Sequence, residues 1–469
     1  MGLNVSELIE ALPADLEPTQ SLASDASLQA MLQELAHRPV PVGRFPRLWA
    51  LGTLQGKIAA AYLAWFLRSS YASAEKKEEA LNEAHLKAAL KLLGTMGYLR
   101  GAIMKLGQVL GAYPDVAPEQ FMEVLGRLHF EAPAMHFSLL RENVRNELGD
   151  DPEALFADFE TEAFAAASLG QVHRARLPES NRAVAVKIQY PNIARTIRQD
   201  LENFKTIMFP MRLSGDWDNL REQFTDMVTT LEMETDYEQE AENLRIARLA
   251  FAEADEIDVP RVYPERSTRR VLTMDLIEGL HLDDFLATNP SQEVRDRHGR
   301  QILLAAMKLS YGSHLLHADP HPGNYLFQRD GRLGYIDFGC CQRYTDQIVA
   351  YLEEVEEAML RSPERLREAL IRAGDLTPKQ QQDAARLRLM EDWCDWVAEP
   401  LRYDGAFDFA ADSYLQRGIE LYGELVRRRY FRSQPINTWM TRQLLGVRLM
   451  LHRLGARVNM KEIHERVSG

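Results

Sequence analysis

The sequence predicts an α+β fold in which a small, partly stranded region precedes a larger helical region, with a helical extension at the N-terminal side. Two observations predict this. Short runs of β-branched and apolar residues bounded by turn residues are concentrated between positions 159 and 189 and recur at 270–274. Beyond Gly279 the spacing of apolar residues is helical nearly everywhere, except around the dipeptide Asp330-Gly331.

The composition indicates a soluble globular protein and argues against nucleic acid as a main partner. The chain has 469 residues, so two or three packed units are expected. It is 46% hydrophobic and 26% charged, and its net charge of -14 does not favour phosphate-backbone binding. The 3 cysteines, two of them adjacent, do not form a disulfide framework and favour a reducing, cytoplasmic compartment.

The N-terminal region 1–74 contains the longest apolar run, Ile58–Leu67 (IAAAYLAWFL). This run is too short to span a bilayer, which needs about 20 apolar residues. The wider segment Phe45–Arg68 is either an amphipathic helix lying on a membrane surface or, as is commoner, a helix packed on the rest of the fold. The first alternative leads us to expect a peripheral association with the inner membrane.

The rest of the chain divides by pattern into three further regions. Apolar residues with helical spacing over 75–113, in two pieces separated near Gly94–Gly97, predict a helical extension. Strands are expected at 159–166, 171–177, 183–189 and 270–274, and a long acidic helix at 217–251. The predicted organisation is therefore an N-terminal region, a helical extension, a small lobe and a helical lobe, at 1–74, 75–135, 136–275 and 276–469.

The dipeptide Asp330-Gly331 between short apolar runs predicts a β-hairpin with a two-residue turn. Counting outward from that turn places Asn324 opposite Asp337, and opposed residues hold their Cβ atoms about 5 Å apart. An amide and a carboxylate oxygen that converge in this way suit Mg²⁺. Asp319, five residues before Asn324, adds a second carboxylate beside the expected magnesium site.

A lysine and a carboxylate elsewhere in the chain are candidate partners. Lys187 lies on the predicted strand AVAVKIQ, on the face opposite to its valines and isoleucine. In the acidic helix, Asp236 and Glu240 lie four apart on one face with Asn243 just beyond, so a carboxylate there could hold Lys187. The remaining acidic residues of that helix are interpreted as a solvated face: Glu232, Glu238 and Glu242.

The segment AAASLGQV between the first two predicted strands has two interpretations. Backbone N–H groups of such a loop can point at anionic oxygens, so it could cover phosphate groups. It could also be a simple turn. Only Gly170 is a glycine here, which makes the loop stiffer than the glycine-rich flaps of kinases.

Taken in order, these features resemble a protein kinase: a flap, a strand lysine, a helix glutamate, an apolar strand and linker, Asp-x4-Asn, a hairpin and Asp-Phe-Gly. The sequence departs from that pattern in three places. HADPHPGN replaces His-Arg-Asp, no Ala-Pro-Glu follows Asp-Phe-Gly, and KLGQ precedes the strands. With AAAS, AVKIQYP and E-x-D-Y-x-x-E-A, the chain resembles the UbiB family of atypical kinase-like proteins, which is associated with ubiquinone and other prenyl-lipid metabolism.

The resemblance implies a role for each matching residue. Lys187 would pair with Glu240 and bind the α- and β-phosphates, and Asp319 would be the catalytic-loop aspartate. Asn324 and Asp337 would hold the metal. The other implied residues are the nucleotide-covering Ala165, Ala166, Ala167 and Ser168, the adenine hinge Met274–Ile277 with backbone contacts at Asp275 and Ile277, the K-x-G-Q pair Lys105 and Gln108, and the E-x-D pair Glu234 and Asp236.

The resemblance also implies an activity, with ATP and Mg²⁺ as cofactors. In the family the K-x-G-Q extension packs where an ordinary kinase receives a peptide, so an ATPase that transfers phosphate to water is favoured over a small-molecule or protein kinase. The implied partners are ATP, an isoprenoid or phenolic lipid intermediate, a membrane surface, and a second copy or a biosynthetic complex.

Two other interpretations remain open from the residues. The fold could hold nucleotide without turnover, as a scaffold. Alternatively His317, Asp319 and His321 could ligate zinc or iron in a metal hydrolase. A simpler interpretation of the two histidines is that they hydrogen-bond the backbone and fix the loop.

Overall fold

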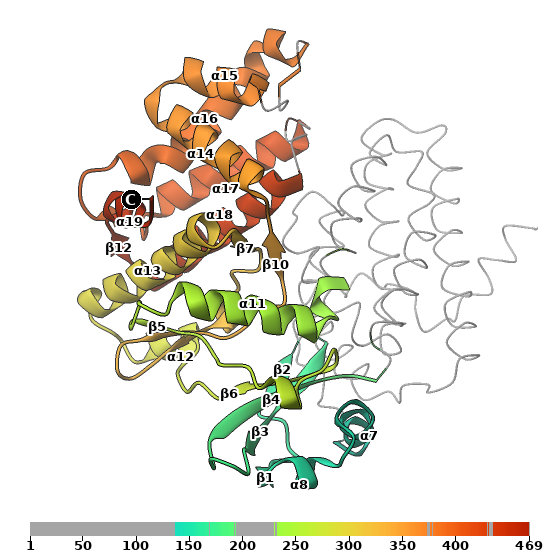
Figure 1. The fold of residues 1–469 in the computed structure, drawn as a ribbon. Coiled ribbons are helices and arrows are strands. Elements are labelled where there is room, and N and C mark those ends of the chain that lie inside the picture. The colour runs from blue at the N-terminus through green and yellow to red at the C-terminus, as the bar shows by residue number, and fades with distance from the viewer. Residues whose placement is uncertain are drawn as a thin grey trace, which may run out of the picture. The chain divides into compact units, whose positions relative to one another are not determined.

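The computed structural model describes residues 137–167, 169–191, 193, 229, 232–372, 376–377, 379–428, 430 and 435–468. The chain forms two compact units, and the second comprises 140–165, 172–189 and 233–469. Figure 1 shows the described elements, nearly all of which belong to the second unit. The predicted regions 1–74 and 75–135 lie outside the described residues, so the predicted domain boundaries stay predictions.

The small lobe contains a five-stranded sheet that confirms the predicted strands, with one change. Its order is β1 (Asp158–Phe159), β3 (Gly170–Arg176), β4 (Ala183–Gln189) and β6 (Val271–Asp275), with β2 (Ala165–Ala167) paired to β3. The strand expected at 159–166 is therefore two short strands separated by a bend. The central strand β4 runs antiparallel to β6 and is buried along almost its whole length.

In the chain, helices lie before this sheet and between its strands β4 and β6. The helices α7 (Phe137–Leu148) and α8 (Pro152–Leu155) precede it, and Asn143 of α7 donates to the Gln189 carbonyl at 3.0 Å. The helix α11 (Tyr237–Ala250) begins at Asp236, whose carboxylate accepts from the Gln239 N–H at 3.2 Å. The single helix predicted over 217–251 is wrong, because a turn at Thr235 and Asp236 interrupts it.

Two small sheets carry the loops of the site. The strands β7 (Leu315–His317) and β10 (Cys341–Arg343) pair antiparallel, and β8 (Tyr325–Phe327) pairs with β9 (Leu333–Tyr335). A short strand, β5 (Ile257–Asp258), runs parallel to β9.

The predicted hairpin exists, but its register is shifted by one residue. Tyr325 faces Tyr335, and the Gln328 N–H donates to the Arg332 carbonyl at 3.0 Å, which leaves a three-residue loop. Gly331 in that loop has φ +86, the conformation that a three-residue hairpin loop requires of its glycine. The prediction that Asn324 lies opposite Asp337 is therefore wrong: Asn324 lies opposite Ile336, whose N–H donates to its carbonyl at 3.0 Å.

The larger lobe is helical, as predicted. Its helices are α12 (Leu282–Ala287), α13 (Gln292–Met307), a π-helix η5 (Lys308–Gly312), α14 (Asp346–Arg361), α15 (Pro363–Arg372), α16 (Ala384–Arg402), α17 (Asp412–Arg427), α18 (Pro435–Leu454) and α19 (Met460–Ser468). Three short 3-10 helices, η4 (Pro264–Arg266), η6 (Pro322–Asn324) and η7 (Gln380–Gln382), and a pair of strands, β11 (Phe407–Asp408) and β12 (Arg457–Val458), complete the described elements.

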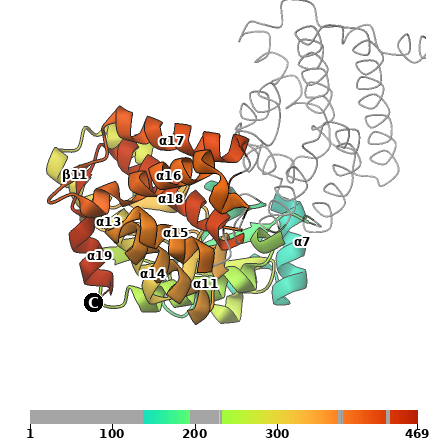
Figure 2. The same ribbon diagram turned by 90° about the horizontal axis from the view of Figure 1, so that it is seen from above.

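A large apolar core joins α12, α13, α16, α17, α18 and α19, and a second cluster packs α14 and α15 against α16. Figure 2 shows α16, α17 and α18 stacked over α13, with α14 and α15 beside them. Trp396 of α16 is 1% exposed, and its ring lies where a Cβ at Gly418 of α17 would be, at 2.0 Å. The two helices therefore approach closely only because position 418 lacks a side chain. Among the described helices, none is both long and apolar enough to cross a bilayer.

Candidate active site

A lysine and two carboxylates from three separate elements meet at the centre of the second unit. Lys187 of β4 donates from Nζ to Glu240 Oε1 at 2.8 Å and Oε2 at 2.9 Å, and to Asp337 Oδ2 at 3.1 Å. The Glu240 side chain is 1% exposed, whereas that of Asp337 is 38% exposed. The ammonium group thus joins a buried carboxylate of α11 to one that faces solvent.

The ionisation of this cluster follows from burial and mutual attraction. Burial alone would lower the pKa of Lys187, but the carboxylates of Asp337 and Glu240 outweigh it and hold that pKa well above its usual value. Burial raises the pKa of Glu240 to about 7, against the attraction of Lys187. Lys187 is therefore a permanent cation, while Glu240 can take up a proton near neutral pH.

Tyr237 supports the cluster in a way that the sequence reasoning missed. The Lys187 Nζ lies 5.0 Å from the centre of its ring, which is within the range of a cation–π contact. Tyr237 is 1% exposed, and its hydroxyl has no hydrogen-bond partner among the described residues. The available signal was its position three residues before Glu240, on the same helix face.

The Asp-Phe-Gly segment is held from both sides. Asp337 Oδ1 accepts from the Gly339 N–H at 3.0 Å, and its carbonyl accepts from His317 Nε2 at 2.8 Å. The Phe338 carbonyl accepts from Asn243 Nδ2 at 3.0 Å, and both residues are fully buried. One helix, α11, therefore positions Glu240 and the residue that follows Asp337.

The two histidines of HADPHPGN act on the backbone, as the simpler interpretation predicts. Burial lowers the pKa of His317, so its ring is neutral, and Nε2 must carry the proton because a carbonyl only accepts. His321 Nδ1 accepts from the Gly323 N–H at 3.0 Å. Within the described part of the chain, no three His, Cys, Asp or Glu side chains gather into a metal site.

The loop from Asp319 to Asn324 fixes the orientation of the Asn324 amide. Asn324 Nδ2 donates to the Asp319 carbonyl at 2.7 Å, while no described residue donates a hydrogen bond to its Oδ1. Asn324 is half-buried, and the Asp337 carboxylate is 38% exposed. Asn324 lies opposite Ile336, the neighbour of Asp337 in the chain, and an oriented amide oxygen and a solvent-facing carboxylate are groups that fit Mg²⁺, which prefers oxygen ligands and keeps several of its waters.

Helix α18 supports the same loop. A Cβ at Gly446 would lie 2.2 Å from Pro320 Cγ, so the helix backbone presses directly on the residue after Asp319. Sequence spacing gave no sign of this contact, because the two residues are far apart in the chain.

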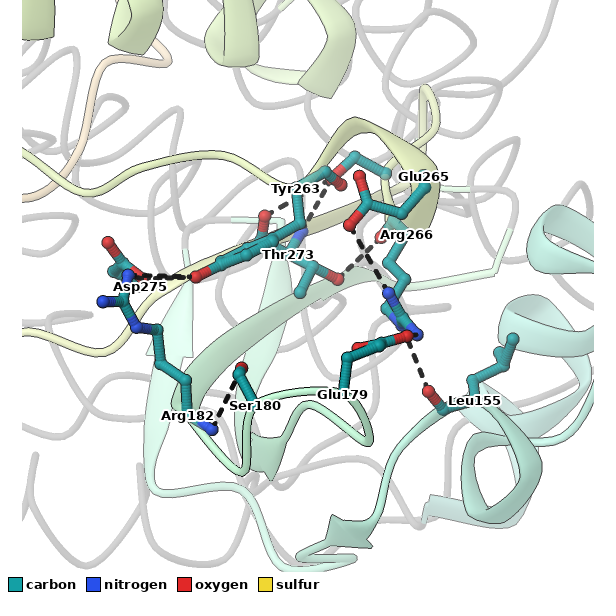
Figure 3. Close-up of polar contacts among 10 residues, drawn as sticks. Leu155, Glu179, Ser180, Arg182, Tyr263, Glu265, Arg266, Thr273 and Asp275 are labelled. Atoms are coloured by element: carbon teal, nitrogen blue, oxygen red, sulfur yellow. Dashed lines mark hydrogen bonds and ion pairs between the residues drawn. The ribbon is translucent and has the colours of Figure 1, made fainter.

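The predicted adenine hinge is braced by a polar network, drawn in Figure 3. The Asp275 carboxylate accepts from the Tyr263 hydroxyl at 2.7 Å and from Arg182 at 3.3 Å. The Asp275 N–H donates to the Arg261 carbonyl at 2.9 Å. A backbone contact of Asp275 with adenine would therefore use its carbonyl oxygen.

The remaining predicted site residues have mixed outcomes. Lys105, Gln108 and Ser168 lie outside the described residues. Ala165, Ala166 and Ala167 form strand β2 and not a loop, which corrects the predicted flap in its first three residues. Glu234 is buried, and Asp236 caps α11 and pairs with Arg269 at 3.3 Å. Ile277 follows β6 and is half-buried.

A strand lysine joined to a helix glutamate and to the Asp-Phe-Gly carboxylate, beside an Asp-x4-Asn loop, defines a kinase-like nucleotide site. The family model of the ABC1 atypical kinase-like domain matches residues 127–369. The chain belongs to this family, and the predicted UbiB resemblance is confirmed.

Named relatives and a solved structure agree with this assignment. The chain is 26% identical to the atypical kinase COQ8 of Saccharomyces cerevisiae, with 91% of this chain and 85% of that protein covered. It is 29% identical to the probable serine/threonine-protein kinase abkA of Dictyostelium discoideum, over 63% of this chain and only 55% of that protein. The structure of Rv3197 from Mycobacterium tuberculosis, solved with erythromycin, matches with a TM-score of 0.56 and 26% identity, covering 83% of this chain and 98% of that one.

Proposed function

We propose that this protein is a Mg²⁺-dependent ATPase that supports the biosynthesis of ubiquinone or another prenyl lipid. The observation that carries the proposal is the position of Lys187, which bridges Glu240 and Asp337. A cation fixed in this way would neutralise charge on the phosphates of a bound nucleotide. Phosphoryl transfer depends mainly on such positioning and neutralisation.

The residues of the site would divide the work as follows. Lys187 would contact the α- and β-phosphates, and the hinge at Asp275 and Ile277 would contact the adenine. Asn324 and Asp337 would hold Mg²⁺, which supplies further charge neutralisation at the phosphate oxygens. Asp319 would orient the acceptor, for which we propose water. An isoprenoid or phenolic hydroxyl is the alternative acceptor.

The proposed role in prenyl-lipid biosynthesis is based on similarity to other proteins. The yeast relative is named atypical kinase COQ8, and the match covers most of both chains. The similar structure of Rv3197 was solved as a complex with erythromycin, which supports the idea that a protein of this fold can hold a large organic molecule. We propose a cytoplasmic location with peripheral attachment to the inner membrane through Phe45–Arg68, which co-sedimentation with anionic liposomes would test.

The test of turnover compares Asp319→Asn with the wild type. We expect hydrolysis to fall by about 10²-fold or more, because the oriented carboxylate is lost, while the Kd for ATP stays unchanged. Asp330→Asn is the matched control, since Asp330 is an exposed carboxylate in the same hairpin. Equal hydrolysis by Asp319→Asn and the wild type would contradict catalysis and favour the scaffold.

A second measurement identifies the acceptor. ATP labelled at the γ-phosphate should release label as inorganic phosphate in the presence or absence of an added phenol or isoprenol. Label that appears on the added hydroxyl compound would replace the ATPase by a small-molecule kinase. Label on the protein or on an added peptide would indicate a protein kinase.

A further inference from the structure

The larger lobe contains a cavity of about 250 Å³. None of its lining residues belongs to the nucleotide site. It lies between α13, the π-helix η5, α14, α16 and α18, and we call it the C-terminal cavity. Its inner wall is made of buried side chains such as Leu303, Trp393 and Leu451. Half-buried residues such as Tyr351, Val355 and Tyr430 form its outer part.

The size and lining of the C-terminal cavity suit a compact apolar molecule. Most of its lining residues are aliphatic, aromatic or methionine side chains. Protein interiors are close-packed, and a cavity of about 150 Å³ with such a lining stays dry and accepts benzene. A cavity of about 250 Å³ has room for two fused rings or a branched aliphatic body of similar size.

Two polar residues of α18 bring more hydrogen-bond donors to the wall of the C-terminal cavity than there are acceptors for them. Arg448 is 3% exposed and has no carboxylate within ion-pair distance among the described residues. Its donors reach the backbone carbonyls of Trp396, at 3.3 Å, and Val397, at 2.6 Å, and its guanidinium carbon lies 4.3 Å from the centre of the Trp396 ring. Gln443 is 7% exposed; its Oε1 accepts from Ser310, and its Nε2 has no hydrogen-bond partner in the described part of the chain.

The acidic residue of the wall does not balance Arg448. Glu356 already accepts from the Tyr311 hydroxyl and pairs with His464. The hydrogen bond to Glu356 raises the pKa of His464, which favours a charged imidazolium as its partner. The Glu356–His464 pair is then neutral as a whole. Glu399, which is not part of the lining, attracts Arg448 but forms its ion pair with Arg417, so Arg448 still adds a positive charge to the lining.

We propose that the C-terminal cavity binds a small aromatic or branched aliphatic carboxylate. The apolar body of the ligand would fill the space between α13, α14 and α16, and its carboxylate would lie toward α18, near Arg448 and Gln443. A buried cation without an ion-pair partner carries a desolvation cost that an anionic ligand offsets. This inference is independent of ATP hydrolysis, because the two sites share no residue.

The test uses one ring system with three different head groups. Calorimetric titration of the full-length protein with 2-naphthoate, 2-naphthalenemethanol and 2-naphthylmethylamine should give saturable binding at one site. We expect the carboxylate to bind at least about tenfold more tightly than the amine, which corresponds to about 1.4 kcal/mol. Equal affinity for the three compounds would overturn the proposed head group, and no saturable binding would overturn the site.

Substitutions locate the binding. Val355→Phe fills the outer part of the C-terminal cavity and should weaken 2-naphthoate by at least about tenfold. Ile419→Phe is the matched control, because Ile419 is 52% exposed on α17 and does not line the cavity. Binding that survives Val355→Phe unchanged would place the ligand elsewhere.

A head-group variant completes the test. Gln443→Met keeps the volume of the side chain, removes an unpaired donor, and should reduce the preference for carboxylate over alcohol. Arg448→Gln should abolish that preference if the variant folds, as judged by circular dichroism. A preference unchanged in both folded variants would contradict the role of α18.

Discussion

Lys187 keeps its charge inside the protein because two carboxylates share it. The buried partner, Glu240, is held at 2.8 Å, and the solvent-facing partner, Asp337, at 3.1 Å. Removal of one partner from a buried ion pair typically costs about 3–5 kcal/mol, because the other charge is left uncompensated. The cluster of Lys187, Glu240 and Asp337 is therefore stable when all three groups are charged. A change in the protonation of any one of them weakens it.

The pH dependence of ATP hydrolysis should report on Glu240. Its pKa is raised to about 7, so Glu240 gains a proton as the pH falls through neutrality, and Lys187 loses the charge of its buried anchor. We therefore expect the rate to fall as the pH decreases, with a midpoint near 7. The measurement is the rate between about pH 6 and pH 8, a range in which an unperturbed glutamate does not titrate.

Matched variants separate this effect from other titrations. Glu240→Gln should give a low rate without the midpoint near 7. Glu242→Gln should keep the wild-type profile, because Glu242 lies outside the cluster and pairs with Arg245. A wild-type midpoint in Glu240→Gln would show that another group titrates.

At the scale of elements, the catalytic loop depends on two helices that approach it from different directions. Helix α11 holds the Asp-Phe-Gly segment through Asn243, and α18 presses on Pro320 at Gly446. Neither contact is a direct contact with phosphate. Both nevertheless help to position Asp337 and Asp319, together with the hydrogen bonds that His317 and Asn324 make to the backbone of those two residues.

Gly446→Ala should damage the site, although alanine is the better helix former. The new Cβ would lie 2.2 Å from Pro320 Cγ, so the loop that carries Asp319 must shift. Overpacking of this kind costs about 1–3 kcal/mol, and we expect a lower free energy of unfolding together with a fall in kcat of about tenfold.

The control for this prediction is Gly423→Ala. Gly423 lies on α17, and a Cβ there would meet no atom within 4 Å. This substitution should stabilise the protein by about 0.5–1 kcal/mol through helix propensity and leave kcat unchanged. Denaturant unfolding and steady-state hydrolysis measure both effects, and equal behaviour of the two variants would contradict the close packing at Pro320.

At the scale of the whole molecule, nucleotide and metal should stabilise the fold together. A ligand present at about 100 times its Kd adds about 2.7 kcal/mol to the free energy of unfolding. ATP with Mg²⁺ should therefore raise the Tm, and chelation of the metal should reduce that increase. In Asp337→Asn, ATP should raise the Tm by the same amount with Mg²⁺ and after chelation. In Asp330→Asn, the increase should still be larger with Mg²⁺. A Tm increase that does not depend on Mg²⁺ in the wild type would argue against the metal site.

The sequence predicted the elements of the fold better than their contacts. Alternation in AVAVKIQ was enough to place Lys187 on a strand, and the four-residue spacing of Asp236 and Glu240 indicated a carboxylate partner. The hairpin register was wrong because Asp-Gly is compatible both with a two-residue turn and with a three-residue loop that ends in a left-handed glycine. The predicted acidic helix was too long because Asp236 caps a new helix.

Other features had no local signal. The contact between Gly446 and Pro320 and the hydrogen bond from Asn243 to Phe338 join positions about a hundred residues apart, so no periodicity encodes them. The C-terminal cavity is also invisible in the sequence, because a helix face that lines a cavity has the same apolar spacing as one that is fully packed.

The hydrogen bond between Asn243 and the Phe338 carbonyl limits how the nucleotide cleft can rearrange. Any rearrangement that turns the Phe338 carbonyl away from α11 must break that bond and leave the fully buried Asn243 amide without this acceptor. Inhibitors that need the backbone of the Asp-Phe-Gly segment to flip should therefore bind weakly, and the cleft should select those that accept this backbone as it lies.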